Sequence, residues 1–276
     1  SSVVHGEFRP SLEVVRNAPE VNGEVLAGLG KAFKLVEESI KKGAPPSDKL
    51  KAAIETELGY GAGKPAPAGL DYAKAALEVS TRYYEAGFAQ DFEYYPGIVS
   101  VYNNYEKGDA ERAERLAPMV WQSCERAGGK EAGDYWCLST QTELSLILNK
   151  NADLLELLPR MLARADVGWM LSSTVSKMTT LCAARDMAGQ DTRALHHVID
   201  ALNARIEALD AQGQAKKAPG ADAKALDAAF AKTTGAWTEQ TCEALRHKLG
   251  ARPVGDAEDA NEKAAAAITK KVMNST

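Results

Sequence analysis

The residues best suited to bind a ligand are three aromatic residues, one acid and two cations in the middle of the chain. Glu143 follows Trp136 by seven residues, or two helical turns, so both side chains would project from about the same side of a helix. Lys177 and Arg185 are eight residues apart and would also share a side, where they could bind a phosphate or a carboxylate. The predicted ligand- or partner-binding residues are Tyr95, Trp136, Glu143, Trp169, Lys177 and Arg185.

The cysteines and histidines are not arranged as metal or redox sites. No two cysteines have the CxxC spacing. The adjacent His196 and His197 would point about 100° apart on a helix and could not share a metal. We therefore expect no metal site and no cofactor, with reduced cysteines buried on apolar helix faces in cytosolic surroundings. The cysteines are Cys124, Cys137, Cys182 and Cys242.

The chain also lacks the usual motifs of nucleophilic and phosphate-binding enzymes. The serines around Ser172 are not part of a Gly-x-Ser-x-Gly elbow. The glycine-rich stretch from Gly59 to Lys64 has neither the Walker spacing nor a Ser or Thr after the lysine, so we interpret it as a linker. An enzyme is still the alternative to a binding module: its active site would use Glu143 with Lys177, Arg185 or a serine.

The elements that must position these residues are helices. Apolar residues recur at steps of three and four along most of the chain, and no period-two run of β-branched residues predicts a strand. Short polar turns near residues 108, 150 and 190 recur about 40 residues apart, each with a helical pattern on both sides. Because a single hairpin cannot bury its apolar face alone, this repeat is typical of an α-solenoid. The predicted fold class is all-α, in the form of an irregular α-solenoid.

Two prolines and one polar stretch modify this prediction. Pro118 and Pro159 fall inside the second helices of two hairpins, where a proline costs about 3 kcal/mol, so we expect a kink or an early break at both. The sequence AQGQAKKAPGA near residue 211 indicates a flexible link. The predicted organisation is an N-terminal extension at 1–20, a helical-repeat domain at 21–210, a linker at 211–225 and a C-terminal helical segment at 226–276.

Composition narrows the classes of partner. The chain has 276 residues, of which 26% are charged, and a formal net charge of -5. This acidic balance argues against nucleic acid as a main partner, because phosphate binding needs a basic face. No stretch approaches about 18 uninterrupted apolar residues, so we expect no membrane span and a cytoplasmic location.

Four short motifs carry a resemblance to a known family. They are Tyr95-Pro96-Gly97-Ile98 at a helix start, the Gly108-Asp109 turn, Tyr135-Trp136 with Glu143, and Trp169 followed by Ser172 and Thr174. With these motifs, the segment from about Val21 to Leu209 resembles the tetratricopeptide-like TRAF-binding domain of apoptosis signal-regulating MAP kinase kinase kinases and its bacterial relatives. The resemblance implies tetratricopeptide-like helical hairpins and a regulatory role without catalysis.

The expected function follows from the repeat and from this resemblance. Bacterial modules of this kind are associated with effectors of anti-phage immunity and are proposed sensors of a nucleotide-like signal. We therefore expect a non-catalytic regulatory module that binds a protein partner or a small signal molecule in stress or immune signalling. The sequence does not identify residues that would bind a TRAF protein, so no TRAF partner is inferred. The binding surface is predicted on the inner face formed by the first helix of each hairpin.

Overall fold

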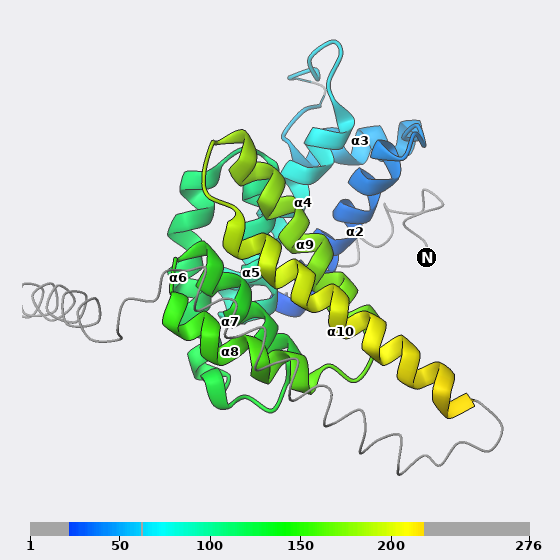
Figure 1. Cartoon of the computed structure of the whole chain (residues 1–276). Coiled ribbons are helices and arrows are strands. Elements are labelled where there is room, and N and C mark those ends of the chain that lie inside the picture. Colours follow the sequence, from blue (N-terminus) through cyan, green and yellow to red (C-terminus); the bar gives the residue numbers. More distant parts are fainter. Residues whose placement is uncertain (1–21, 62, 218–276) are drawn as a thin grey trace, which may run out of the picture.

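A computed structural model describes residues 22–61 and 63–217, and the regular elements within these residues are helices joined by turns and loops (Figure 1). The prediction of an all-α fold is confirmed for this part of the chain, where the one β-type pairing is an isolated bridge between Gly61 and Lys64. The elements are α2 (Gly23–Lys41), α3 (Asp48–Glu57), α4 (Tyr72–Asp91), α5 (Tyr94–Glu106), α6 (Ala110–Arg126), the short 3-10 helix η2 (Gly129–Glu131), α7 (Tyr135–Ile147), α8 (Asn151–Arg164), α9 (Gly168–Met187) and α10 (Arg193–Lys217).

The three predicted turns separate α5 from α6, α7 from α8, and α9 from α10, as the spacing of about 40 residues indicates. Each turn contains a residue with positive φ: Gly108 at 82°, Asn149 at 56° and Gly189 at 66°. Glycine and asparagine adopt this left-handed conformation at the lowest cost, so they end the first helix of each hairpin. Asp109 then accepts a hydrogen bond from the backbone N–H of Arg112 and caps the start of α6.

Of the two outcomes predicted at the prolines, a kink or an early break, the early break is wrong. Pro118 lies inside α6 and Pro159 lies inside α8, and both helices continue past them. Buried apolar residues precede and follow each proline, including Ala117 and Leu158, both fully buried. The packing on both sides of the proline holds each helix together against the roughly 3 kcal/mol that an interior proline costs.

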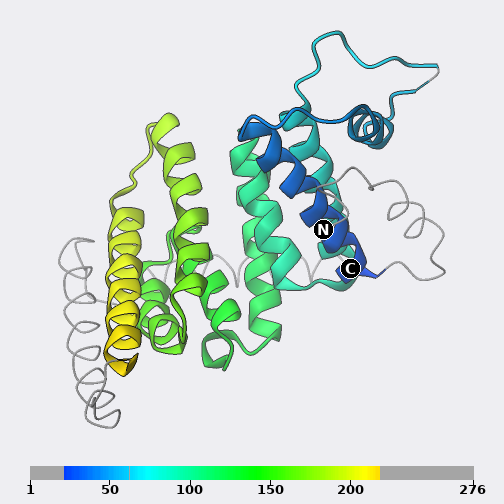
Figure 2. The ribbon, with the colours of Figure 1, turned by 90° about the vertical axis from the view of Figure 1, so that its right-hand side faces the viewer.

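The first helices of the three hairpins run parallel to one another. The hydroxyl of Tyr94, at the start of α5, donates to Asp134 Oδ2, just before α7, over 2.7 Å. The Tyr135 hydroxyl, at the start of α7, lies 2.9 Å from Thr174 Oγ1 in the first half of α9. At the other end, Arg185 of α9 donates to the carbonyl of Ile147, where α7 ends. Figure 2 shows the chain progressing across the molecule, from the N-terminal helices on the right to α10 on the left.

The N-terminal helices form a tighter pair. The backbone N–H of Gly23, at the start of α2, donates to Asp91 Oδ2, at the end of α4, over 2.7 Å, so the two helices are antiparallel. A Cβ added to Gly87 would lie 2.8 Å from the carbonyl oxygen of Gly23. No side chain fits in this gap, and the two backbones approach each other directly. Helix α3 and the loop after it are inserted between α2 and α4.

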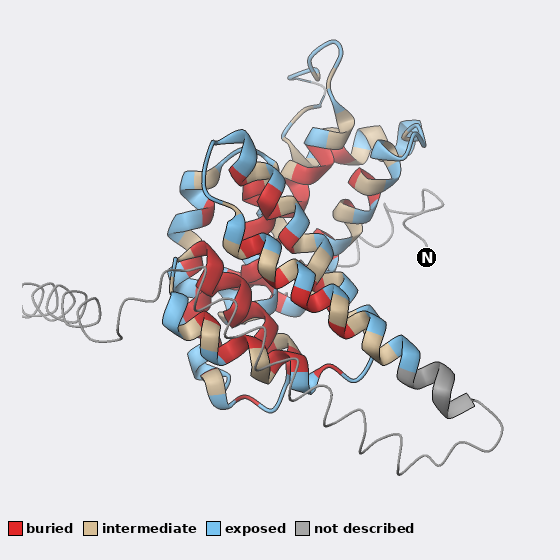
Figure 3. Cartoon of the chain, in the orientation of Figure 1, coloured by how far each residue is buried: buried red, intermediate tan, exposed pale blue. Residues whose placement is uncertain are grey.

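The core has two parts. A small cluster holds α2, α3 and α4 together around Phe33 and Ile54, and a large cluster runs through α4 to α10. Helix α7 is at the centre of the large cluster, and twelve of its thirteen residues are buried, Trp136 excepted. Figure 3 shows α7 as an almost continuous buried helix, surrounded by elements with one exposed side.

One of the predicted domain boundaries, at residue 211, lies within the described residues. Helix α10 extends to Lys217, so residues 211–217, the first part of the predicted linker, are helical. The predicted N-terminal extension at 1–20, the rest of the linker and the C-terminal segment at 226–276 lie outside the described residues, and Cys242 lies there with them. Of the other cysteines, Cys124, Cys137 and Cys182 are buried free thiols.

Candidate functional site

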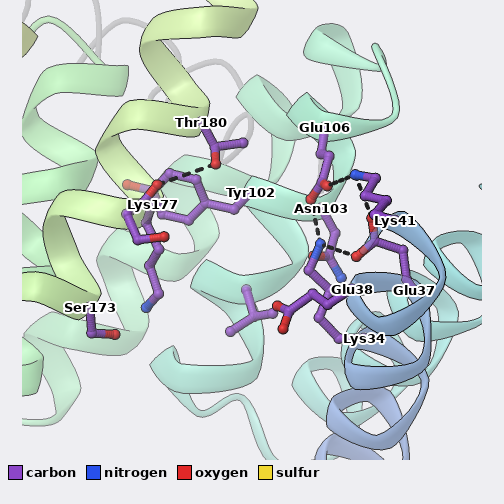
Figure 4. Close-up of a pocket in the computed structure, with 12 residues that line it drawn as sticks. Lys34, Glu37, Glu38, Lys41, Tyr102, Asn103, Glu106, Ser173, Lys177 and Thr180 are labelled. Atoms are coloured by element: carbon purple, nitrogen blue, oxygen red, sulfur yellow. Dashed lines mark hydrogen bonds and ion pairs between the residues drawn. The ribbon is translucent and has the colours of Figure 1, made fainter. Parts of the chain in front are cut away.

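A groove of about 410 Å³ opens between α2 and α9, with α5 as its floor (Figure 4). Three helices therefore contribute to it, although they are far apart in the sequence. Its lining contains charged and hydroxyl-bearing side chains and one aliphatic residue, Val99. The lining residues are Lys34, Glu37, Glu38 and Lys41 from α2, Val99, Tyr102, Asn103 and Glu106 from α5, and Ser173, Ser176, Lys177 and Thr180 from α9.

A four-membered ionic cluster joins α2 to the end of α5. Lys34 Nζ lies 3.0 Å from Glu37 Oε2 and 2.5 Å from Glu106 Oε2. Lys41 Nζ pairs with Glu37 and also lies 2.5 Å from Glu106 Oε1. Glu37 is fully buried and Lys41 is half exposed, so the lysine stems reach from the surface to a carboxylate beneath them. The cluster holds two cations and two anions and is neutral as a whole.

The pKa values reflect these pairs. Burial by itself would raise the pKa of Glu106 and lower that of Lys41. The ion pairs outweigh burial in both cases: they lower the pKa of Glu106 below its ordinary value and raise the pKa of Lys41 to about 12. Both residues are therefore charged at neutral pH.

The α9 wall presents a cation among hydroxyl groups. Lys177 is partly exposed and makes no ion pair within 4 Å in the described part of the chain. Ser173 lies one turn before it and Thr180 about one turn after it, and Figure 4 shows all three side chains along this wall. Of the six predicted binding residues, Lys177 lines the groove.

Glu143 lies beneath the groove. It is 1% exposed, because α7 is covered by its neighbours on almost every side, and it does not line the groove, although the sequence predicted it as a binding residue. Ser139 Oγ donates to Glu143 Oε1 over 2.9 Å, and the same hydroxyl lies 2.9 Å from Thr174 Oγ1. The Tyr102 hydroxyl interacts with the carboxyl group without forming a hydrogen bond of regular geometry.

Burial dominates the electrostatics of this carboxyl group. Desolvation raises the pKa of Glu143 above its ordinary value, and the nearby charge of Lys177 and the hydroxyls of Ser139 and Tyr102 offset only part of the rise. Burial also raises the pKa of Tyr102, and the Glu143 carboxylate adds to that shift. Glu143 is thus a core acid held by hydroxyl groups, with one cation at a distance.

Arg185 is hydrogen-bonded to the end of α7. It is 8% exposed, and its Nη2 donates to the carbonyl oxygens of Leu146 and Ile147, each over 3.1 Å. These carbonyls belong to the last turn of α7, where no intrahelical donor remains. The prediction that Arg185 stands beside Lys177 as a ligand-binding cation is therefore not supported by its position. The eight-residue spacing placed the two residues on similar sides of α9 but could not indicate how deeply α7 covers one of them.

The three predicted aromatic residues lie at the starts of first helices. Trp169 is 64% exposed and its ring centroid lies 5.6 Å from that of the partly buried Trp136. Tyr95 is 46% exposed and contacts Tyr84 edge-on at 6.3 Å. None of the three lines the groove. Tyr95 and Trp169 each lie four residues before a groove residue, Val99 and Ser173, and so extend the same helix faces beyond the groove.

Sequence reasoning missed the α2 wall altogether. None of the predicted binding residues lies on α2, whereas Glu37 is fully buried and both Glu37 and Glu38 line the groove. The signal that could have been used is the spacing of Lys34, Glu37 and Lys41, which places opposite charges at i,i+3 and i,i+4 on one face. That pattern predicts ion pairs along a helix, but it does not reveal that α5 and α9 close over them.

Comparisons with protein-family models, curated proteins and solved structures return no match for this chain. In residues 22–61 and 63–217, no helix has the length and apolar character needed to cross a bilayer. The same residues contain no group of three or more histidine, cysteine, aspartate or glutamate side chains placed to hold a metal ion.

Proposed function

We propose that this chain is a non-catalytic helical-repeat module that binds a partner or a small signal molecule in the groove between α2 and α9. The observation that carries the proposal is that three first helices, α2, α5 and α9, supply every residue that lines the groove. A concave face built from successive repeats is the surface that helical-repeat proteins generally use for binding.

The packing supports an irregular, tetratricopeptide-like solenoid. The hairpins α5–α6, α7–α8 and α9–α10 follow one another, and their first helices are parallel. We assign α2 and α4 as one further hairpin, interrupted by the insertion at 42–71 that contains α3. In support, the ion pairs of Lys34 and Lys41 place the end of α2 beside the end of α5, as expected for neighbouring first helices.

The wider role in stress or immune signalling rests on the resemblance to the TRAF-binding domain of signalling kinases and its bacterial relatives. That family regulates other domains and has no catalytic centre of its own. The groove is compatible with such a role because its volume of about 410 Å³ lies within the range of small-molecule sites.

The alternative, an enzyme that uses Glu143, receives less support. Glu143 does not line the groove, and Tyr102 lies between the two. Its neighbours Ser139 and Thr174 are also buried. A substrate in the groove would therefore not contact the carboxyl group that this alternative requires.

The proposal is tested by filling the groove. Ser176→Trp in the full-length protein would place a large ring on the exposed α9 wall, and Met119→Trp, on the exposed surface of α6, is the matched control. Each protein is purified under native conditions from the cells that produce it, and co-purifying proteins and small molecules are identified by mass spectrometry. We expect at least one species to be retained by the wild type and by Met119→Trp and lost from Ser176→Trp at an unchanged melting temperature. The same retained set in all three proteins would overturn the proposal.

A further inference from the structure

The charges that line the groove are mostly compensated within the protein. Lys34, Lys41, Glu37 and Glu106 form the ionic cluster and leave no net charge on that part of the lining. Among the remaining lining residues, one acid and one cation are left over: Glu38 on α2 and Lys177 on α9. Neither makes an ion pair within 4 Å in the described part of the chain.

The two uncompensated charges belong to facing walls. Figure 4 shows the side chains of Glu38 and Lys177 on opposite sides of the same space, with Tyr102 between the helices that carry them. A ligand with a single charge would satisfy only one of the two residues. A ligand with an anionic end and a cationic end could satisfy both at once.

The hydroxyl groups of α9 indicate which end of a ligand lies there. Ser172, Thr174, Thr179 and Thr180 each donate to the carbonyl oxygen four residues earlier. The hydroxyls of Ser173 and Ser176 make no such bond, and both residues line the groove beside Lys177. Two free O–H donors and one ammonium group form a set of donors that suits a carboxylate.

Tyr102 forms the floor between these two walls. It is 5% exposed and lines the groove, and its buried hydroxyl interacts with the Glu143 carboxyl group beneath the groove. The hydroxyl is therefore not counted among the groups offered to a ligand, and the uncompensated polar groups lie on α2 and α9.

We propose that the groove binds a short zwitterion of the size of an amino acid or a dipeptide, with its carboxylate at Lys177, Ser173 and Ser176 and its ammonium group at Glu38. This inference rests on the proposed function, because it names the class of ligand for the same groove. The volume of about 410 Å³ accommodates a molecule of this size.

The experiment uses four probes of one scaffold. Alanine and alanylalanine carry both charges, N-acetylalanine carries only the anion, and alanine amide carries only the cation. Binding to the full chain is followed by chemical-shift changes of groove residues and by calorimetry, at probe concentrations up to about 10 mM. We expect at least one zwitterion to bind, and each singly charged analogue to bind about tenfold or more weakly, because each loses one charge-assisted contact.

Two variants, each of which neutralises one groove residue, test which residue binds which end of the ligand. Lys177→Gln is expected to weaken binding of the zwitterion about tenfold and to leave the weaker binding of alanine amide unchanged, and Glu38→Gln is expected to spare N-acetylalanine instead. Lys31→Gln on α2 and Glu207→Gln on α10 make the same charge changes at exposed positions outside the groove and are expected to leave binding unchanged. Melting temperatures of all four variants show that loss of binding is not loss of fold.

The other outcomes overturn the inference. If N-acetylalanine binds as tightly as alanine, the groove is a simple anion site, and the zwitterion proposal is wrong while the groove is still a binding site. If no probe binds and Ser176→Trp still loses a retained species, the ligand belongs to another class. If Ser176→Trp also retains every species, the proposed function fails together with the inference.

Discussion

Two glutamates buried to the same depth are stabilised in different ways in two regions of the molecule. Glu37, on α2, is 0% exposed and is contacted by two lysines. Glu143, on α7, is 1% exposed and is contacted by the hydroxyl of Ser139, with raised pKa. The difference follows from position. Glu37 lies on an outer helix, where long lysine side chains reach it and keep contact with water, whereas α7 is surrounded by other helices.

This comparison teaches that burial alone does not determine how a carboxyl group is accommodated. At the edge of the fold, cations that remain partly solvated can compensate the charge at low cost. At the centre of the fold, a cation would itself be desolvated. The carboxyl group is there hydrogen-bonded by hydroxyl groups instead, and its raised pKa favours the neutral, protonated form. Three predictions test this difference, and the largest expected effect comes first.

Removing both lysines should destabilise the protein strongly. Lys34→Ala with Lys41→Ala leaves Glu37 buried with no cation beside it, and breaking a buried ion pair in this way typically costs roughly 3–5 kcal/mol. The free energy of unfolding, measured by chemical denaturation, should fall by about that amount. Lys31→Ala with Lys42→Ala removes the same charge from exposed positions on and just after α2 and should change it by less than about 0.5 kcal/mol. A loss of under about 1 kcal/mol for the first pair would show that Glu37 does not depend on the lysines.

The two cations of α9 should differ sharply. Arg185→Ala removes two hydrogen bonds to buried carbonyls of α7 and should cost roughly 2–4 kcal/mol of unfolding free energy. Lys177→Ala, on the groove wall, should change the unfolding free energy by less than about 0.5 kcal/mol. Thermal and urea denaturation of the two variants give the comparison directly. Equal stabilities would mean that Arg185 does not hold the end of α7.

The smallest effect is a difference in pH dependence. Because the folded pKa of Glu143 is raised above 4.5, its contribution to stability is fully present below that pH and is lost as the pH rises through the folded pKa. The folded pKa of Glu106 is lowered, since its lysine partners outweigh its burial, so its contribution is present above 4.5 and is lost as the pH falls through the folded pKa. Glu143→Gln should therefore flatten the stability profile above pH 4.5, and Glu106→Gln should flatten it below.

Denaturation curves at a series of pH values give the free energy of unfolding as a function of pH for the wild type and both variants. At acidic pH, Glu143→Gln should cost no more than about 1 kcal/mol, because the amide oxygen can still accept from Ser139. If the two variants change the profile on the same side of pH 4.5, the difference between the two regions is not electrostatic.

The helices and their turns could be predicted from the sequence because their causes are local. Gly108, Asn149 and Gly189 adopt the left-handed conformations that end helices, and their spacing is visible in the chain. The prolines show where local reasoning fails: the cost at Pro118 is local, but the packing that offsets it comes from other helices. The all-α class was thus accessible from the sequence, and helix continuity at the two prolines was not.

The candidate site depends on how helices far apart in the sequence pack against one another, and sequence patterns do not give that packing. Of the six predicted binding residues, Lys177 lines the groove. Arg185 and Glu143 are buried because α7 lies against α9 and α5. The hydrophobic pattern of a single helix does not show how deeply a neighbouring helix covers its side chains. The α2 wall was missed because the repeat of about 40 residues seen in the sequence begins with α5, and the segment at 42–71, which contains α3, separates α2 from α4.

The close approach of α2 and α4 has a mechanical consequence for the groove. At Gly87 the two backbones are in direct contact, so α2 cannot slide along α4 or tilt against it without a collision of main-chain atoms. Helix α9, by contrast, packs on α5 and is joined to α7 through the side chains of Tyr135, Thr174 and Arg185. The α2 wall of the groove is therefore positioned by main-chain contact with α4, so its place relative to α4 does not depend on side-chain rotamers.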